Sequence, residues 1–179
     1  MKRTLWIAAA LIVVVLGIRP AARAENLSAL NPIYLPSISQ PGAPVQTTEQ
    51  RQVADQVLAL VNSERAAAGC AALAMNDKLI AAAQGQSRDM AEQNFFSHTN
   101  PDPTRATLSQ RIDVVGYTWS AIGENIAAGQ NTPAAVMASW MNSAGHKDNI
   151  LNCSYVDIGV GYYVGGSYRF YWTQDFGRP

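Results

Sequence analysis

The C-terminal region carries two segments in which apolar residues alternate, and this pattern limits the possible folds more than any other feature. The apolar residues at every second position are Ile158, Val160 and Tyr162 in the first segment and Tyr168, Phe170 and Trp172 in the second. A period of two is typical of a strand with one buried face. Because Gly165-Gly166 lies between the segments, the pattern predicts a β-hairpin and therefore an antiparallel sheet.

The chain before the hairpin is mainly helical in its pattern. The segments with apolar residues at helical spacing are residues 48–68, 76–93, 107–116 and 132–141, and a further helical turn is expected over 143–151. Thr47 and Thr107 are each followed three residues later by glutamine, which is the signature of a capping box. Residues 117–128 are expected to be extended. Helices that precede an antiparallel hairpin indicate an α+β domain.

The N-terminus has the composition of an export signal. Basic residues at the start precede the apolar run Leu5–Ile18, which is short for a membrane span. The triplet Ala22-Arg23-Ala24 fits a small-x-small cleavage site, so residues 1–24 are expected to be removed as a signal peptide. An uncleaved membrane anchor is the alternative, because Arg19 and Arg23 follow the apolar run.

The rest of the chain divides into a linker and one domain. Residues 25–47 contain several prolines, which disfavour regular structure, and are expected to form an extended linker before a domain over residues 48–179. Without residues 1–24 the chain carries nine basic and 13 acidic residues. Nucleic-acid binding requires a basic face, so no nucleic-acid partner is expected. Membrane attachment is expected only if the signal stays uncleaved as an anchor.

Cys70 and Cys153 are the two cysteines of the chain. In an exported protein such a pair predicts a disulfide. The bond would close a loop of about 84 residues and stabilise the fold by about 4–5 kcal/mol in the chain-entropy model. Two separate buried thiols are the alternative. Neither cysteine lies in a C-x-x-C motif, so no redox role is expected.

Three residues in short polar segments are placed for chemistry, namely His98, Glu124 and His146. The two histidines are the only ones in the chain, and they lie on either side of Glu124 in the sequence. Two imidazoles and a carboxylate could hold a zinc ion with one position open for water. Their spacing does not show that they converge, so a solvated glutamate and two ordinary hydrogen-bonding histidines are the alternative.

Two further patterns have weaker support. Ser143 and His146 are three residues apart and could act as nucleophile and base, but no G-x-S-x-G elbow surrounds the serine. Six aromatic residues could line a ligand groove, although half of the residues in such strands face the core and pack there. These aromatic residues are Trp119, Tyr162, Tyr163, Tyr168, Tyr171 and Trp172.

Five motifs occur in a fixed order and point to a known family. They are Phe-Ser-His, Gly-Glu-Asn-Ile-Ala, Trp-x-x-Ser-x-Gly-His, Ile-Gly-Val-Gly and Tyr-Trp-Thr-Gln-Asp-Phe. Over residues 50–177 this set resembles the CAP superfamily, or SCP domain, which includes cysteine-rich secretory proteins, antigen 5 and plant pathogenesis-related proteins. The bacterial extracellular branch is most similar. The resemblance implies an α-β-α sandwich with a central antiparallel sheet.

The resemblance also implies a surface cleft with two histidines and two acidic residues. His98, Glu124 and His146 match three of these four positions. Many eukaryotic members have a glutamate where this chain has Ser143. The expected cleft therefore consists of His98, Glu124, Ser143 and His146, and the missing acid weakens metal binding and any mechanism that needs paired carboxylates.

Two functions follow as expectations. The first is a secreted binding module that recognises a lipid, glycan, cell-wall or protein partner. The second is a metal-dependent hydrolase in which histidine-bound zinc polarises water and Glu124 is the general base. Zinc is the one cofactor that either function suggests. The missing acid and the lack of an activated nucleophile favour the binding module.

Overall fold

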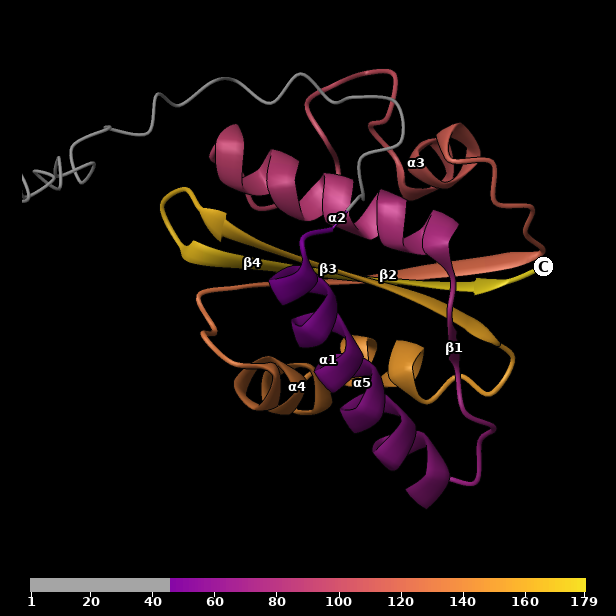
Figure 1. Ribbon diagram of the computed structural model, residues 1–179. Coiled ribbons are helices and arrows are strands. Elements are labelled where there is room, and N and C mark those ends of the chain that lie inside the picture. Colours follow the sequence, from indigo (N-terminus) through magenta and orange to yellow (C-terminus); the bar gives the residue numbers. More distant parts are fainter. Residues whose placement is uncertain (1–45) are drawn as a thin grey trace, which may run out of the picture. The chain divides into compact units, whose positions relative to one another are not determined.

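The computed structural model describes residues 46–179, which form three layers with a sheet in the middle (Figure 1). Helices α2 and α3 cover one face of the sheet, and α1, α4 and α5 cover the other. The helices are α1 (Thr48–Ala67), α2 (Asp77–Glu92), α3 (Leu108–Val114), α4 (Pro133–Met141) and α5 (Ala144–Ile150), and the strands are β1 (Ala74–Met75), β2 (Ala121–Ala128), β3 (Asp157–Gly165) and β4 (Arg169–Arg178). The predicted α-β-α sandwich is confirmed. The predicted signal peptide and the linker up to residue 45 lie outside the described residues and stay predictions.

The sheet has the strand order β1-β3-β4-β2. Strands β3 and β4 form the predicted hairpin, and β2 pairs antiparallel with β4 in a register that places Glu124 opposite Asp175. The two-residue strand β1 pairs parallel with β3 and was not predicted, because two residues carry no periodic pattern. Among the described residues, β2 is therefore an edge strand, and no other strand pairs with its second side.

Local signals in the sequence set the helix limits. In both predicted capping boxes, the threonine side chain accepts from the glutamine N–H while the glutamine side chain accepts from the threonine N–H, at Thr47 with Gln50 and at Thr107 with Gln110. Helix α1 ends just before Gly69, which has a φ of 78° that residues with side chains rarely adopt. Helix limits and predictions consequently agree within one or two residues.

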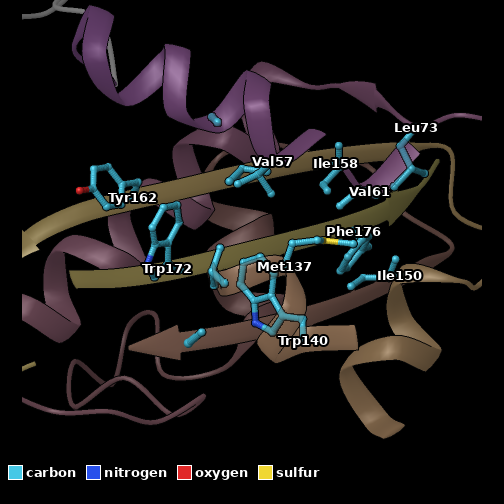
Figure 2. Packing of buried hydrophobic residues seen from close by; sticks show 14 of the residues in the cluster. Val57, Val61, Leu73, Met137, Trp140, Ile150, Ile158, Tyr162, Trp172 and Phe176 are labelled. Atoms are coloured by element: carbon cyan, nitrogen blue, oxygen red, sulfur yellow. The ribbon is translucent and has the colours of Figure 1, made fainter. Parts of the chain in front are cut away.

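The main core lies between the sheet and the layer of α1, α4 and α5 (Figure 2). Trp140 and Trp172 are fully buried there, and the rings of Tyr162 and Trp172 lie 4.4 Å apart across β3 and β4. Tyr171 is also buried, but in a separate cluster under α2, because neighbouring strand residues point to opposite faces. Core packing is thus confirmed for these strand aromatics, and the six aromatic residues do not line one groove.

Helix α2 lies very close to β3 because two glycines leave room for it. A Cβ atom at Gly159 would collide with the backbone of Leu79, and one at Gly161 would collide with the backbone of Ala83. The predicted apolar face of α2 is buried as expected. Its residues are Ile80, Ala83, Ser87, Met90 and Ala91. These contacts hold the first half of α2 against β3.

A covalent bond and a buried arginine tie α1 to the segment after α5. The predicted disulfide Cys70–Cys153 is present, with its Cα atoms 5.0 Å apart. The Arg65 side chain is fully buried and donates to four main-chain carbonyls at 2.8–3.1 Å. These carbonyls belong to Ala71, Ile150, Asn152 and Tyr155. We call Arg65 and the disulfide together the α1–α5 clamp.

Candidate functional site

Glu124 lies on the edge strand β2 and forms a buried ion pair with Arg111 of α3. Nη2 of Arg111 donates to Oε2 of Glu124 at 2.6 Å, and both side chains are 3% exposed. Nη1 of Arg111 also donates to the main-chain carbonyls of His98 and Ala106. One arginine therefore fixes both the carboxylate and the loop that carries His98. Such additional hydrogen bonds help to offset the desolvation of a buried charge pair.

His98 is the exposed member of this group. Its Nδ1 lies 2.7 Å from the second oxygen of Glu124, and its side chain is 56% exposed. A carboxylate oxygen can only accept, so in this pair Nδ1 is the nitrogen that carries hydrogen and donates to Glu124. The carboxylate thus orients the imidazole in the way that carboxylates orient histidines in catalytic and metal sites.

His146 comes from α5, on the opposite side of the sheet. Asn125 donates to the main-chain carbonyl of His146 at 3.0 Å, and Asn149 donates to that of Glu124 at 3.2 Å, so α5 packs against the free edge of β2. Burial lowers the pKa of His146, and the charge of His98 lowers it further.

The donor geometry fits a metal only in part. Both oxygens of Glu124 are engaged, one by Arg111 and one by His98, so this carboxylate is not a free ligand. Within residues 46–179 no three histidine, cysteine or acidic side chains are grouped as a metal ion would require. The predicted three-ligand set is therefore not assembled here. A two-histidine arrangement, with Glu124 behind His98, is compatible with these contacts.

A second carboxyl group lies beside Glu124 in the interior. Asp175 is directly opposite Glu124 in the strand register and is fully buried. Burial raises the pKa of Asp175 well above its ordinary value, and the neighbouring Glu124 charge raises it further, while Arg111 acts in the opposite direction. Neither carboxyl oxygen of Asp175 has a hydrogen-bond partner among residues 46–179. The site thus contains two acidic residues, although one is hidden from solvent.

Ser143 does not take the place of the missing acid. It precedes α5 at the N-cap position, and its side chain makes no capping hydrogen bond. Among the described residues, no hydroxyl group is hydrogen-bonded to the imidazole of His98 or His146. The suggested Ser143–His146 nucleophile pair therefore has no geometric support.

Arg111 and Asp175 are the site residues that the sequence did not reveal. Asp175 had a detectable signal, since an acidic residue in the middle of a strand of otherwise buried residues is unusual. Arg111 had none, because an arginine in a short amphipathic helix is ordinarily exposed. Its burial depends on a contact with a strand that begins ten residues later in the chain.

The comparison with protein families decides the identity of the fold. Residues 58–176 match the CAP model, described as the cysteine-rich secretory protein family. The chain belongs to the CAP family. A relative in Bacillus subtilis, the uncharacterized protein YkwD, is 40% identical over 121 residues, which are 68% of this chain and 45% of YkwD.

Solved structures show the same CAP fold. An extracellular SCP-domain protein from Bacillus anthracis is 32% identical with a TM-score of 0.65, covering 79% of this chain and 45% of that one. An outer surface protein from Borrelia burgdorferi is 21% identical with a TM-score of 0.64, and the match covers 77% of this chain and 98% of that one. This CAP chain spans less than half of YkwD and of the Bacillus anthracis protein. Within residues 46–179 no helix is long and apolar enough to cross a membrane.

Proposed function

We propose that this CAP domain is a secreted recognition module whose binding surface surrounds His98 at the free edge of β2. The observation that carries the proposal is the His98–Glu124–Arg111 arrangement. It presents one exposed imidazole on a rigid, buried ion pair. Such pre-organisation favours binding, because little freedom is lost when a ligand contacts His98. The partner class is a lipid, glycan, cell-wall or protein ligand outside the cell.

Two relatives support an extracellular setting. The Bacillus anthracis protein is described as extracellular, and the Borrelia burgdorferi protein as an outer surface protein. The disulfide Cys70–Cys153 adds a second argument, since such bonds persist mainly in oxidising compartments. Export through the N-terminal segment is part of the same proposal.

The hydrolase alternative receives less support from the geometry. A general base must be able to take a proton from water, but both oxygens of Glu124 already accept hydrogen bonds and its side chain is 3% exposed. In this arrangement Glu124 is a positioning residue for His98.

Sedimentation with cell envelopes tests the recognition function. The mature protein is mixed with insoluble envelope material of the source organism, and the bound fraction is measured for the wild type and for His98→Ala. We expect the variant to bind at least about tenfold more weakly, as is typical for the loss of a central contact residue. Glu64→Ala, at an exposed position on α1, is the matched control. Equal binding by the wild type and His98→Ala would contradict the proposal.

Zinc binding is proposed for the two histidines alone. His98 would coordinate through Nε2 and His146 through its imidazole, while Glu124 would hold His98 from behind. Calorimetric titration of the mature protein with zinc is expected to show one site that is lost in His98→Ala and in His146→Ala. Glu124→Gln should weaken this site without abolishing it. A titration that is indifferent to both histidine substitutions would remove zinc from the proposed function.

A further inference from the structure

Two exposed aromatic rings lie in contact at one end of the molecule. Phe96 follows α2, Tyr168 lies in the turn between β3 and β4, and their ring centroids are 5.9 Å apart with the planes tilted by 57°. The side chains remain 44% and 54% exposed. Single exposed aromatic residues are common, but a contacting pair from segments 72 positions apart is a built surface. We call Phe96 and Tyr168 the aromatic platform.

The aromatic platform is held rigidly from below. Oδ1 of Asn94 accepts from both the N–H and the hydroxyl group of Ser167, at 2.9 and 2.7 Å, and so joins the two segments. Figure 1 shows the β3–β4 turn beside the C-terminal end of α2. The buried ring of Tyr171 supports Tyr168 edge-on at 5.9 Å. Asn94 and Arg169, on either side of this junction, both adopt a positive φ. Strained backbone of this kind is concentrated at functional sites.

The chemistry around the aromatic platform suits a sugar better than a charged surface. Ring faces carry partial negative charge and attract the C–H faces of a sugar, while hydroxyl and amide groups can bind its hydroxyls. Ser167 and Asn94 supply such groups at the rim. In the chain, Arg169 follows Tyr168 and Glu92 lies four residues before Phe96, so charges of both signs accompany the rings and a neutral ligand is favoured.

Other partner classes fit this surface less well. Insertion into an anionic membrane would need an excess of basic residues, and the basic Arg169 beside Tyr168 is accompanied by the acidic Glu92 before Phe96. A stable protein interface buries about 800 Å² on each side, which is far more than two partly covered rings can provide. A neutral oligosaccharide remains as the ligand that matches the size, the ring chemistry and the charge.

The aromatic platform is adjacent to His98 along the chain. Only Ser97 separates Phe96 from His98, and the carbonyl of Ser97 is fixed by Gln86 at 2.9 Å. Two residues that are two positions apart have Cα atoms at most about 7.6 Å from each other. We infer that the aromatic platform is a stacking site for a neutral oligosaccharide that continues toward His98. This inference rests on the proposed recognition function and names its ligand class.

Titration with two neutral oligosaccharides tests the inference. The probes are a β-1,4-linked tetrasaccharide of glucose and one of N-acetylglucosamine, titrated into the mature protein by calorimetry. We expect at least one probe to bind, and Phe96→Ala and Tyr168→Ala each to weaken it about tenfold, since each removes one stacked ring. Tyr168→Phe keeps the ring and should stay within about twofold of the wild type. Trp119→Ala, at an aromatic residue that is 38% exposed elsewhere, is the control and should change nothing.

Three results would overturn the inference. They are no binding of either probe, binding that both alanine variants retain, and binding to phosphatidylcholine vesicles in place of the saccharides. If His98-dependent envelope binding persists in any of these cases, only the aromatic platform loses its assignment. If envelope binding is absent as well, the recognition function fails too. Thermal unfolding of each variant verifies that these surface changes leave the fold intact.

Discussion

Asp175 is a buried carboxyl group placed opposite a second carboxylate. Directly opposed strand residues have Cβ atoms about 4.5–5.5 Å apart, and like charges there are destabilising. Glu124 already has Arg111 and His98 as partners, whereas Asp175 has no hydrogen-bond partner among residues 46–179. Burial, and then the charge of Glu124, therefore favour the protonated form of Asp175 and raise its pKa.

The substitution Asp175→Asn is expected to stabilise the protein at neutral pH. The raised pKa of Asp175 means that the folded state keeps a proton that the unfolded chain loses above about pH 4, so folding weakens as pH rises through that range. Asparagine has no carboxyl group to titrate, so the stability of the variant does not fall over this pH range for that reason. We expect a gain of at least about 1 kcal/mol at pH 7, because one unit of pKa corresponds to about 1.4 kcal/mol.

Urea unfolding at pH 7 and near pH 3.5 measures this difference. The advantage of Asp175→Asn should shrink toward zero at the lower pH, where the carboxyl group is protonated in both states. A variant that is less stable than the wild type at pH 7 would show that Asp175 is ionised in the folded protein.

At the scale of elements, the contact between α2 and β3 depends on the absence of two side chains. Gly161→Ala should destabilise the fold by about 1–3 kcal/mol or more, since the new methyl group would press on the backbone of Ala83, which cannot give way as a side chain can. Gly85→Ala, in helix α2 itself, is the matched control. Its Cβ meets nothing within 4 Å, so it should stabilise the protein by up to about 1 kcal/mol. Chemical unfolding of both variants tests this, and equal effects would contradict it.

The same elements show what a sequence can predict. The capping threonines, the periodic apolar residues and the hairpin glycines act locally, so the limits of α1, α2 and the β3–β4 hairpin followed from them. The family motifs pointed to His98, Glu124 and His146. The burial of Arg111, the register that opposes Asp175 to Glu124 and the two-residue β1 could not be predicted, because each depends on contacts between distant segments.

At the scale of the whole molecule, the α1–α5 clamp joins the C-terminal end of α1 to the segment that follows α5. Replacing both cysteines by serine should cost about 4 kcal/mol in the chain-entropy model. Arg65→Met should cost about 3 kcal/mol or more, since four buried carbonyls would lose their donor. Because both devices tie the same segments, the combined loss should be smaller than the sum.

Thermal and urea unfolding gives the free energy of unfolding of the cysteine-to-serine variant, of Arg65→Met and of the variant that combines them. If the combined variant does not fold, reduction of the disulfide in the wild type and in Arg65→Met gives the same comparison. Strictly additive losses would show that the arginine and the disulfide act independently.

The free edge of β2 has a consequence for the protein in a crowded environment. The main-chain carbonyls of Glu124 and Ile126 accept from the side chains of Asn149 and Trp140, at 3.2 and 3.3 Å. The opposite edge is the two-residue β1. Exposed strand edges are templates for uncontrolled pairing between molecules. Beyond β1 this edge belongs to β3, where the side chains of Gln46 and Gln84 bind main-chain groups of Val160 and Tyr162. With side chains on both edges, many copies can accumulate at a surface without strand pairing between molecules.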